Sequence, residues 1–535
     1  MSHYTVTIMP EGQRRTSRAG TAFLDVIKDS AILANLPCGG EGRCGSCRVT
    51  VREGAPLPTP EDLRLIPKGK IQEGVRLACR LIVTGDMVVE VPASARVAGT
   101  GSSWDEVRVL SERPGSRDHL CLAVDLGTTS IATALVDPTS REVLAHASAL
   151  NPQAAFGADV ISRINAVIKD QTALARQQAL ATGQILSLLR KLSQRLDLSR
   201  GSVTQITVAG NPTMEHLFLG RDPTPIAYAP FTPAFLSAQK LTASELSLET
   251  DAAAGVWVFP ILSGYVGGDT VAFVWSARMH ESDEMILGLD IGTNGEIVLG
   301  NRKRLLACST AAGPAFEGSH ITDGMRADLG AIEGVAIRAN AVTLTVKGGG
   351  HPRGICGSGL FDAVSEMRRS GLIDRTGRIT ADAAPSGLKE RVVRANGSTR
   401  FVLSSDPPGS VGITQKDIRE IQLAKGAMRA GVEVLLSEMG IGWGDIERVL
   451  VAGAFGNYLK AESIVGVGVL PTSLSKRIVF VGDAALSGAI EAAQSDEARQ
   501  GIEDLARRIG YIELSSDKQF NDLFISSLTF EESSI

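Results

Sequence analysis

The chain has little of what nucleic-acid-binding and membrane proteins need. Its 535 residues carry 54 Lys and Arg against 59 Asp and Glu, and the positive residues form no dense block. Nucleic-acid binding usually requires a basic face that neutralises phosphates, so this charge balance argues against that class. No run of about 18 apolar residues occurs, and the first residues lack the apolar segment of a signal peptide. The sequence therefore predicts a cytoplasmic protein with neither a nucleic acid nor a membrane as partner.

Aromatic residues are also scarce, whereas glycine and clustered cysteine stand out. Aromatics make up 4% of the chain, against 57 glycines, a content that favours tight turns and the close backbone approaches found at phosphate and cofactor loops. Four of the seven cysteines lie between residues 38 and 79. In a reducing compartment, clustered cysteines bind metal or do redox chemistry more often than they form disulfides. The other three, Cys121, Cys308 and Cys356, are expected to be buried, inert thiols.

The clustered cysteines have the spacing Cys38-x5-Cys44-x2-Cys47, and 31 residues separate Cys47 from Cys79. Three thiolates on one glycine-rich loop, with a fourth from a distant segment, can surround a two-iron cluster. Structural zinc is an alternative, although zinc sites more often pair two Cys-x2-Cys knuckles and the second knuckle is missing here. Coincidence is the remaining alternative.

Beyond a glycine- and serine-rich stretch near residue 100, the chain contains two similar halves. Residues 120–137 read as an apolar strand, a turn containing Asp125, Gly127, Thr128 and Thr129, and a second strand. The pattern recurs 165 residues later, with Asp290, Gly292, Thr293 and Asn294 in the matching places. Each half continues with a third strand, long helical segments over residues 160–198 or 416–439, and a strand that ends in glycine. Duplication of one strand-and-helix module is the economical interpretation.

The two Asp-x-Gly-Thr turns point to polyphosphate chemistry. A hairpin of this kind directs backbone N–H groups and hydroxyls at phosphates, while the aspartate holds hydrated Mg²⁺ or orients water. One such turn alone is more often an ordinary hairpin. Two turns, each following an apolar strand in duplicated halves, favour a polyphosphate with Mg²⁺ as the ligand, and Asp125 and Asp290 are the candidate catalytic residues.

Both regions resemble known families. The cysteine spacing and the segment around Cys79 are similar to those of adrenodoxin-like and related bacterial ferredoxins, which implies a [2Fe–2S] cluster held by Cys38, Cys44, Cys47 and Cys79 in an α+β β-grasp domain. The paired turns resemble the phosphate loops of the actin, Hsp70 and acetate/sugar kinase (ASKHA) superfamily, which has a duplicated α/β ribonuclease-H-like body. Residues 449–456 resemble its adenosine motif, in which Gly453 and Gly456 would lie close to a nucleotide bound between the halves.

A ferredoxin domain joined to such a body resembles the reductive activators of corrinoid-dependent enzymes (RACE family). Residues 210–217, 264–269, 312–317, 354–360 and 417–426 stand where that family has glycine-rich or helical motifs. The resemblance implies ATP-dependent, one-electron reduction of Co(II) to Co(I) in the corrinoid protein of a methyltransferase system. It also implies an electron donor such as a reductase or a ferredoxin, and a homodimer is compatible with it. The alternatives are an ATP-dependent reductase of a non-corrinoid acceptor and a small-molecule kinase with an appended ferredoxin domain.

The expected organisation is a [2Fe–2S] ferredoxin-type domain over residues 1–95, a linker over 96–117, a first ribonuclease-H-like half over 118–284 and a second over 285–535. His216 follows the strand that closes the first half. A structural role for this histidine is favoured over contact with a phosphate or a partner.

Overall fold

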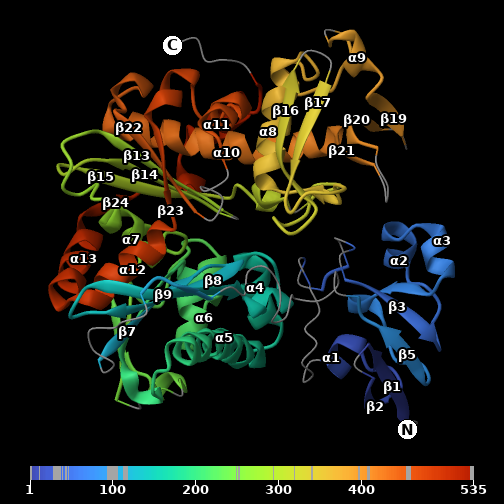
Figure 1. The fold of residues 1–535 in the computed structure, drawn as a ribbon, viewed down its shortest axis with the longest axis horizontal. Helices are drawn as coiled ribbons and strands as arrows, with labels where there is room; N and C mark the ends of the chain where they lie inside the picture. Colours follow the sequence, from blue (N-terminus) through green and yellow to red (C-terminus); the bar gives the residue numbers. More distant parts are fainter. Residues whose placement is uncertain are drawn as a thin grey trace. The chain divides into compact units, whose positions relative to one another are not determined.

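The computed structural model describes most of the chain (Figure 1). The described residues are 3–10, 12–27, 36, 38, 40–42, 45, 47–92, 107–111, 119–248, 250, 253–292, 294–318, 320–338, 341–382, 384–395, 398–405, 410–453 and 459–530. Three expected site residues, Cys44, Thr293 and Gly456, lie outside them. The chain divides into two compact units, one of Met1–Phe259 with Ala489–Ala498 and one of Pro260–Gly488 with Arg499–Ile535.

The N-terminal region forms a five-stranded mixed sheet in the order β2-β1-β5-β3-β4. Its strands are β1 (His3–Met9), β2 (Gln13–Arg18), β3 (Arg48–Glu53), β4 (Val75–Leu77) and β5 (Met87–Glu90). The short helices are α1 (Phe23–Ile27), α2 (Pro60–Leu65), α3 (Lys68–Gln72) and the 3₁₀ turn η1 (Ala78–Arg80). Val6, Ile8, Val49 and Val51 alternate along β1 and β3 and are buried beneath Phe23 of α1. One helix on a mixed sheet agrees with the β-grasp prediction.

The first half of the body is built on a seven-stranded sheet in the order β11-β12-β10-β7-β8-β9-β6. The strands are β6 (Val107–Val109), β7 (Leu120–Leu126), β8 (Ser130–Asp137), β9 (Glu142–Leu150), β10 (Val203–Gly210), β11 (Gln239–Thr242) and β12 (Gly255–Val258). Strands β7, β8 and β9 are antiparallel, whereas β10 joins β7 in parallel. Helices α4 (Val160–Lys169) and α5 (Thr172–Leu196) confirm the two helices expected over residues 160–198, and α6 (Pro212–Leu219) follows β10.

One strand was not expected from the sequence. Strand β6 lies inside the segment assigned to the linker and pairs antiparallel with β9 at the edge of the sheet. Three residues are too few to show the alternation that reveals a strand, so its pairing depends on a neighbour about 38 residues away. Most of the expected linker lies outside the described residues.

The second half repeats this topology in a six-stranded sheet, in the order β23-β22-β13-β14-β15-β24. Its strands are β13 (Ile286–Ile291), β14 (Gly295–Gly300), β15 (Leu305–Thr310), β22 (Arg448–Ala452), β23 (Ile478–Gly482) and β24 (Ile509–Tyr511). Strands β13, β14 and β15 are antiparallel and β22 joins β13 in parallel, as β10 joins β7 in the first half. The structure therefore confirms the predicted duplication.

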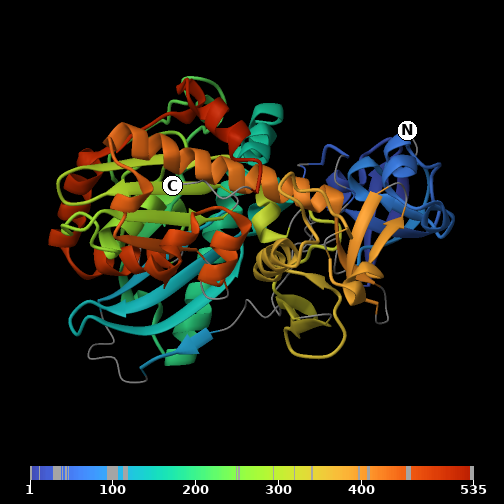
Figure 2. The ribbon, with the colours of Figure 1, turned by 90° about the horizontal axis from the view of Figure 1, so that it is seen from above.

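Helix α10 (Gln415–Met439) packs on the second sheet (Figure 2). Gly431 permits a close approach, because a Cβ atom there would lie 2.7 Å from Ile297 Cδ1 and 2.8 Å from Thr310 Cγ2. The helix begins with a capping box between Thr414 and Asp417 and ends at Gly440, whose φ of 69° is the left-handed conformation that favours glycine. The helical segment expected over residues 416–439 is thus confirmed.

Between β15 and α10 the second half carries two small sheets. One has the order β17-β16-β18, with β16 (Ala331–Arg338), β17 (Ala341–Val346) and β18 (Gly354–Ile355), and helix α8 (Gly357–Arg369) packs on it. The other has the order β19-β20-β21, with β19 (Val392–Ala395), β20 (Ser398–Ser404) and β21 (Val411–Thr414).

The remaining helices are α7 (Gly268–Ser276), α9 (Ser386–Lys389), α11 (Ala461–Val467), α12 (Ala484–Gln494), α13 (Asp496–Arg508) and α14 (Phe520–Ser526). Within the described ranges, no helix has the length and apolar character needed to span a membrane.

Candidate functional site

The five-stranded sheet brings two of the expected cluster cysteines together. Cys47 lies immediately before β3 and Cys79 lies in η1, and the Ala78 N–H donates to the Cys47 carbonyl at 2.8 Å. The two Sγ atoms are 3.4 Å apart, much farther than the ~2.05 Å of a disulfide. Cys38 is half-buried in a turn in which its carbonyl accepts from the Glu41 N–H at 3.2 Å. Cys44 lies outside the described residues.

The electrostatics of this thiol pair suit a metal centre. The side-chain hydrogen bond between Cys47 and Cys79 is the main cause that lowers the pKa of Cys47 to about 7. The same hydrogen bond and burial raise the pKa of Cys79. One thiol is therefore poised to ionise beside a second, and thiolates are the ligands that iron–sulfur clusters use. Over the described positions, no three such side chains come close enough to hold one metal ion.

The first Asp-x-Gly-Thr turn connects β7 to β8 in the first unit. Asp125 lies near the end of β7, next to Ala132 of β8 and Ala209 of β10. Gly127 is sterically required, because a Cβ atom there would lie 2.7 Å from the Ser130 carbonyl oxygen. Thr128 and Thr129 complete the turn. The structure confirms the predicted strand, turn and strand at this place.

Three buried polar side chains hold this turn, and of these only Asn211 lies in a segment that the sequence analysis singled out as a family motif. Asn151 Nδ2 donates to the Gly127 carbonyl at 2.8 Å, and Asn211 Nδ2 donates to Thr128 Oγ1 at 2.9 Å. Arg163, which is fully buried, donates through Nη2 to the Thr128 carbonyl. Asn211 also caps α6 by accepting from the Met214 N–H at 3.1 Å. The Asn-Pro pair at residues 211–212 is the local signal that could have revealed this cap.

The second turn connects β13 to β14 in the second unit. Asp290 lies near the end of β13, and the Gly292 N–H donates to the Asn294 carbonyl at 3.1 Å. The end of β22 approaches this turn at Gly453, whose φ is 100° and where a Cβ atom would lie 2.8 Å from Asp290 Oδ1. Gly453 thus lies against the aspartate, and its expected approach to a nucleotide stays a prediction. Thr293 and Gly456 lie outside the described residues.

Asp290 belongs to an acidic group that the sequence analysis only partly anticipated. The other members are Asp269 at the start of α7, Glu296 on β14 and Asp483 between β23 and α12. Asp483 caps α12, because its Oδ1 accepts from the Leu486 N–H at 2.8 Å. Asp483 follows an apolar strand as Asp125 and Asp290 do, so the same strand–aspartate signal could have identified it.

Burial raises the pKa values throughout this acidic group, and repulsion between carboxylates adds to the shifts of Asp290 and Glu296. Burial, followed by the charges of Asp269 and Asp483, raises the pKa of Asp290 to about 7. Burial raises the pKa values of Asp269 and Asp483 to about 6 each. Burial is again the main cause that raises the pKa of Glu296 well above its ordinary value. A nearby cation would offset the repulsion at Asp290, although among the described residues no three such carboxylates lie close enough together to hold one metal ion directly.

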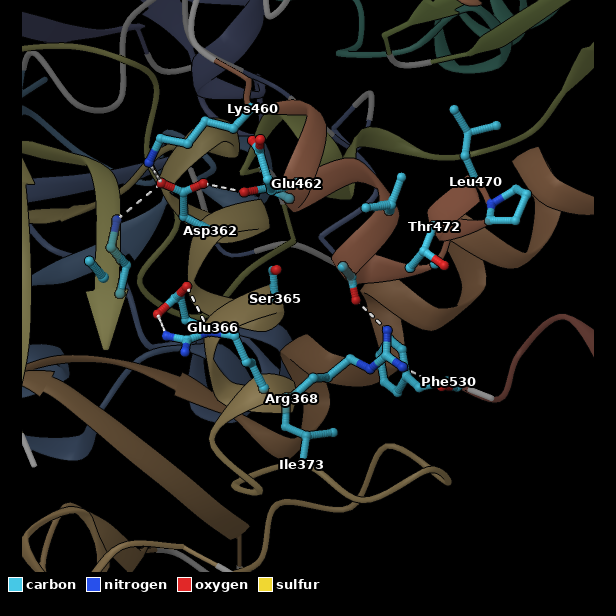
Figure 3. Close-up of a pocket in the computed structure, with 18 of the residues that line it drawn as sticks. Asp362, Ser365, Glu366, Arg368, Ile373, Lys460, Glu462, Leu470, Thr472 and Phe530 are labelled. Carbon is cyan, nitrogen blue, oxygen red and sulfur yellow. Dashed lines mark hydrogen bonds and ion pairs between the residues drawn. The ribbon is translucent and has the colours of Figure 1, made fainter. Parts of the chain in front are cut away.

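The second unit also contains a cavity of about 1190 Å³ beside α8 and α11 (Figure 3). The two helices meet where a Cβ atom on Gly466 would lie 2.0 Å from Ser365 Oγ. Asp362 of α8 accepts hydrogen bonds from Lys460 Nζ and Ser463 Oγ, both at 2.5 Å. Arg368 extends toward the buried Phe530, with its guanidinium carbon 4.7 Å from the ring centroid. The sequence analysis did not anticipate this cavity.

The histidine and cysteines expected to be structural are buried. His216 Nε2 accepts from the Ala234 N–H at 2.8 Å, and its Nδ1 lies 2.6 Å from the Pro212 carbonyl. The ring stacks on Phe235 at 4.7 Å, and burial lowers the pKa of His216. This satisfied environment confirms the structural role. Cys121, Cys308 and Cys356 are each at most 4% exposed, and burial raises the pKa of Cys308.

Comparisons with known proteins agree with this division of the chain. Residues 6–84 match the family described as "2Fe-2S iron-sulfur cluster binding domain". Residues 120–282 match "RACo middle region", and residues 284–535 match "C-terminal domain of RACo the ASKHA domain". The fold class expected from the sequence, a ferredoxin domain followed by an ASKHA body, is therefore confirmed.

Similar proteins cover most of the chain. The "Corrinoid activation enzyme RamQ" of Eubacterium limosum is 34% identical over 76% of this chain and 70% of its own length. The "[Co(II) methylated amine-specific corrinoid protein] reductase" of Methanosarcina barkeri is 26% identical over 76% of each chain. A solved structure titled "Reductive activator for corrinoid,iron-sulfur protein" superposes with a TM-score of 0.70 and 30% identity over 98% of both chains. With its cysteine pair and duplicated body matched in this way, the chain belongs to the family of reductive activators of corrinoid proteins.

Proposed function

We propose that this chain uses ATP to reduce the inactive Co(II) form of a corrinoid protein to Co(I), transferring one electron through a [2Fe–2S] cluster. The observation that carries the proposal is the presence, on one polypeptide, of the Cys47–Cys79 thiol pair and the acidic, glycine-lined turn at Asp290. The similarity to two corrinoid activators over three quarters of the chain supports the choice of a corrinoid acceptor.

Cys38, Cys44, Cys47 and Cys79 are the proposed cluster ligands. The Cys47–Cys79 pair fits this role, since its two sulfur atoms face each other at 3.4 Å. When bound, a two-iron cluster supplies one electron at a time. The electron donor is proposed to be a reductase or a ferredoxin.

ATP with Mg²⁺ is the proposed ligand of the two turns. Asp125 and Asp290 would hold or orient the hydrated cation, and the backbone of Gly127, Thr128, Thr129, Gly292, Thr293 and Asn294 would face the phosphates. Gly453 and Gly456 would lie against the nucleoside. The acidic group around Asp290 supports this assignment, because a divalent cation offsets the repulsion that raises the pKa of Asp290.

Nucleotide binding has the energetic scale that the reaction requires. Co(I) is a very strong reductant, so electron transfer to Co(II) is uphill, and each ~59 mV of unfavourable potential costs tenfold in a one-electron equilibrium. A ligand that shifts a two-state equilibrium by about 10⁴ needs about 5.5 kcal/mol of differential affinity, which ATP binding and hydrolysis can supply.

The test is anaerobic absorption spectroscopy of a Co(II) corrinoid protein mixed with this chain and a low-potential reductant. We expect the Co(I) spectrum to form only when Mg-ATP is present. The Asp290→Asn variant should no longer form Co(I) when Mg-ATP is added, and it should retain the visible cluster spectrum. Asp504→Asn is the matched control, since Asp504 is an exposed residue of α13 that pairs with Arg507.

The same assay separates the two alternatives. An ATP-dependent kinase would transfer phosphate to a small molecule and leave Co(II) unchanged. A reductase of another acceptor would, in the presence of ATP, pass the electron of its cluster to that acceptor and leave Co(II) unchanged. Either result would contradict the proposed reaction.

Other features remain proposals of the same kind. We place the ferredoxin-type domain at residues 1–95, the linker at 96–117 and the two ribonuclease-H-like halves at 118–284 and 285–535. We also propose a cytoplasmic location and a homodimer, which equilibrium sedimentation of the full chain would test.

A further inference from the structure

Two arginines hold the loop that carries the proposed cluster ligands. Arg64 of α2 donates through Nη2 to the Gly42 carbonyl at 3.1 Å. Arg80, the residue after Cys79, donates through Nη2 to the Glu41 carbonyl at 2.5 Å. Glu41 and Gly42 lie between Cys38 and Cys47, so both guanidinium groups bind the backbone of the cysteine loop. Hydrogen bonds from a charged guanidinium group to a backbone carbonyl are stronger than hydrogen bonds between two neutral groups.

Arg80 and the loop restrict each other sterically. The φ of Gly42 is 69°, and a Cβ atom at this position would lie 2.6 Å from Arg80 Nε. On its other side the Arg80 guanidinium faces Glu61 of α2, with Nε 3.5 Å from Oε1. The Arg80 side chain, about one third exposed, is therefore confined between the loop and α2. Its Nε is buried and has no hydrogen-bond acceptor among the described residues.

The position of this charge has a consequence for redox chemistry. Reduction adds one negative charge to an iron–sulfur cluster, and nearby positive charges and N–H donors favour the reduced state. Arg80 is adjacent in sequence to Cys79 and reaches the loop that carries the other cysteines. It thus brings a permanent positive charge, which is paired on one side with Glu61, beside the cluster ligands.

We infer that Arg80 is a positioning residue that fixes the cysteine loop through Glu41 and raises the reduction potential of the cluster, with Arg64 as the second anchor of the loop. The inference rests on the cluster assignment made under the proposed function. It assigns a role to a residue that is not itself a ligand.

The experiment is an anaerobic redox titration of the full-length protein, followed by visible absorption and by the electron paramagnetic resonance signal of the reduced cluster. We expect Arg80→Gln to lower the ratio of reduced to oxidised cluster at a fixed potential by about tenfold, equivalent to about 59 mV for one electron. Arg80→Lys keeps the charge and loses the planar fork, so its potential should shift less. Both variants should lose their cluster to a chelator faster than the wild type.

Arg52→Gln is the matched control. Arg52 also carries a positive charge in this sheet, and it lies five residues beyond Cys47 on the extended strand β3. Its guanidinium group pairs with the Glu90 carboxylate at 2.5 Å. Its removal should leave both the potential and the rate of cluster loss unchanged.

Each outcome separates the possible explanations. If Arg80→Gln matches Arg52→Gln in potential and in cluster retention, the role of Arg80 is wrong. If Arg80→Gln cannot hold a cluster while Arg52→Gln does, the positioning role is supported. The effect of Arg80 on the reduction potential of the cluster is then measured in Arg80→Lys. A wild-type protein without iron and sulfide would instead contradict the cluster assignment itself.

Discussion

At the scale of single residues, Lys425 has an unusual environment. It is 2% exposed on α10, its Nζ donates to the Thr529 carbonyl, and the ring of Phe530 lies 5.1 Å away. Burial, followed by the charges of Arg429 and Arg368, lowers the pKa of Lys425 to about 7, while the charge of Glu433 opposes the shift. Above about pH 7 the Lys425 amine is therefore mostly uncharged in the folded protein. In the unfolded chain the same amine stays protonated up to its ordinary pKa of about 10.4.

The sign of the resulting pH dependence follows from proton uptake. Between about pH 7 and pH 10 the unfolded chain binds a proton that the folded chain lacks, so stability rises with pH in this window. We expect the free energy of unfolding of the wild type to increase relative to Lys425→Met by up to about 1.4 kcal/mol per pH unit. Urea unfolding at pH 7, 8 and 9, followed by tryptophan fluorescence, measures it.

Lys416→Met, an exposed position on the same helix, is the control for this measurement. It should follow the wild type at every pH. A constant difference between the wild type and Lys425→Met from pH 7 to pH 9 would show that Lys425 remains charged in the folded protein.

The residues that sequence reasoning identified and those it missed differ in the range of their contacts. Cys47 and Asp290 stand in local patterns, so spacing alone indicated them. Arg163 and Asn211 hold the first turn from positions 35 and 83 residues away from Thr128, and no local pattern encodes such a contact. Glu296 sits inside an apolar strand, and only folding reveals that it shares a buried site with Asp290.

At the scale of secondary-structure elements, Asn211 links a helix to the first turn. Its Oδ1 accepts from the Met214 N–H at the start of α6, while its Nδ2 donates to Thr128 Oγ1. Loss of an N-cap costs about 1 kcal/mol, and loss of one hydrogen bond costs a similar amount. We expect Asn211→Ala to lower the free energy of unfolding by about 1–2 kcal/mol and to weaken ATP binding.

The Asn211→Asp variant separates the two roles. Aspartate retains the acceptor that caps α6 and adds a negative charge that the helix N-terminus favours, but it loses the donor to Thr128. Its stability should stay close to that of the wild type while its ATP affinity, measured by isothermal titration calorimetry, falls. Equal ATP affinity in Asn211→Asp and the wild type would show that the Thr128 contact does not support nucleotide binding.

The elements that the sequence predicted well are those with long periodic patterns. Helices α5 and α10, each of 25 residues, and the paired strands of both large sheets have enough repeats to show their period. Strand β6 is too short, and the strands β19 to β21 carry Ser, Arg and Gly in place of alternating apolar residues. The Thr-x-x-Asp pattern at residues 414–417 is a capping signal that could have placed the start of α10.

At the scale of the whole molecule, electron transfer and nucleotide binding depend on different residues and should be separable. We expect Cys47→Ala to lose the visible cluster absorption and corrinoid activation but to bind ATP as the wild type does. Cys121→Ala is the matched control, because Cys121 is a buried cysteine of β7 outside the cluster loop. Absorption spectra, ATP titration calorimetry and the Co(I) assay measure the three properties. Retained activation in Cys47→Ala would contradict the electron-transfer role.

Mixing two defective variants tests whether both functions must act within one chain. The cluster and nucleotide residues share a polypeptide, and covalent tethering produces effective concentrations of the order of millimolar. At micromolar protein, transfer within a chain should therefore exceed transfer between chains. We expect an equimolar mixture of Cys47→Ala and Asp290→Asn to recover little activation in the Co(I) assay. Recovery approaching a quarter of the wild-type rate would show that the cluster of one chain serves the nucleotide site of another, because half of the randomly formed dimers would be mixed and each mixed dimer of crossed domains would keep one of its two functional combinations.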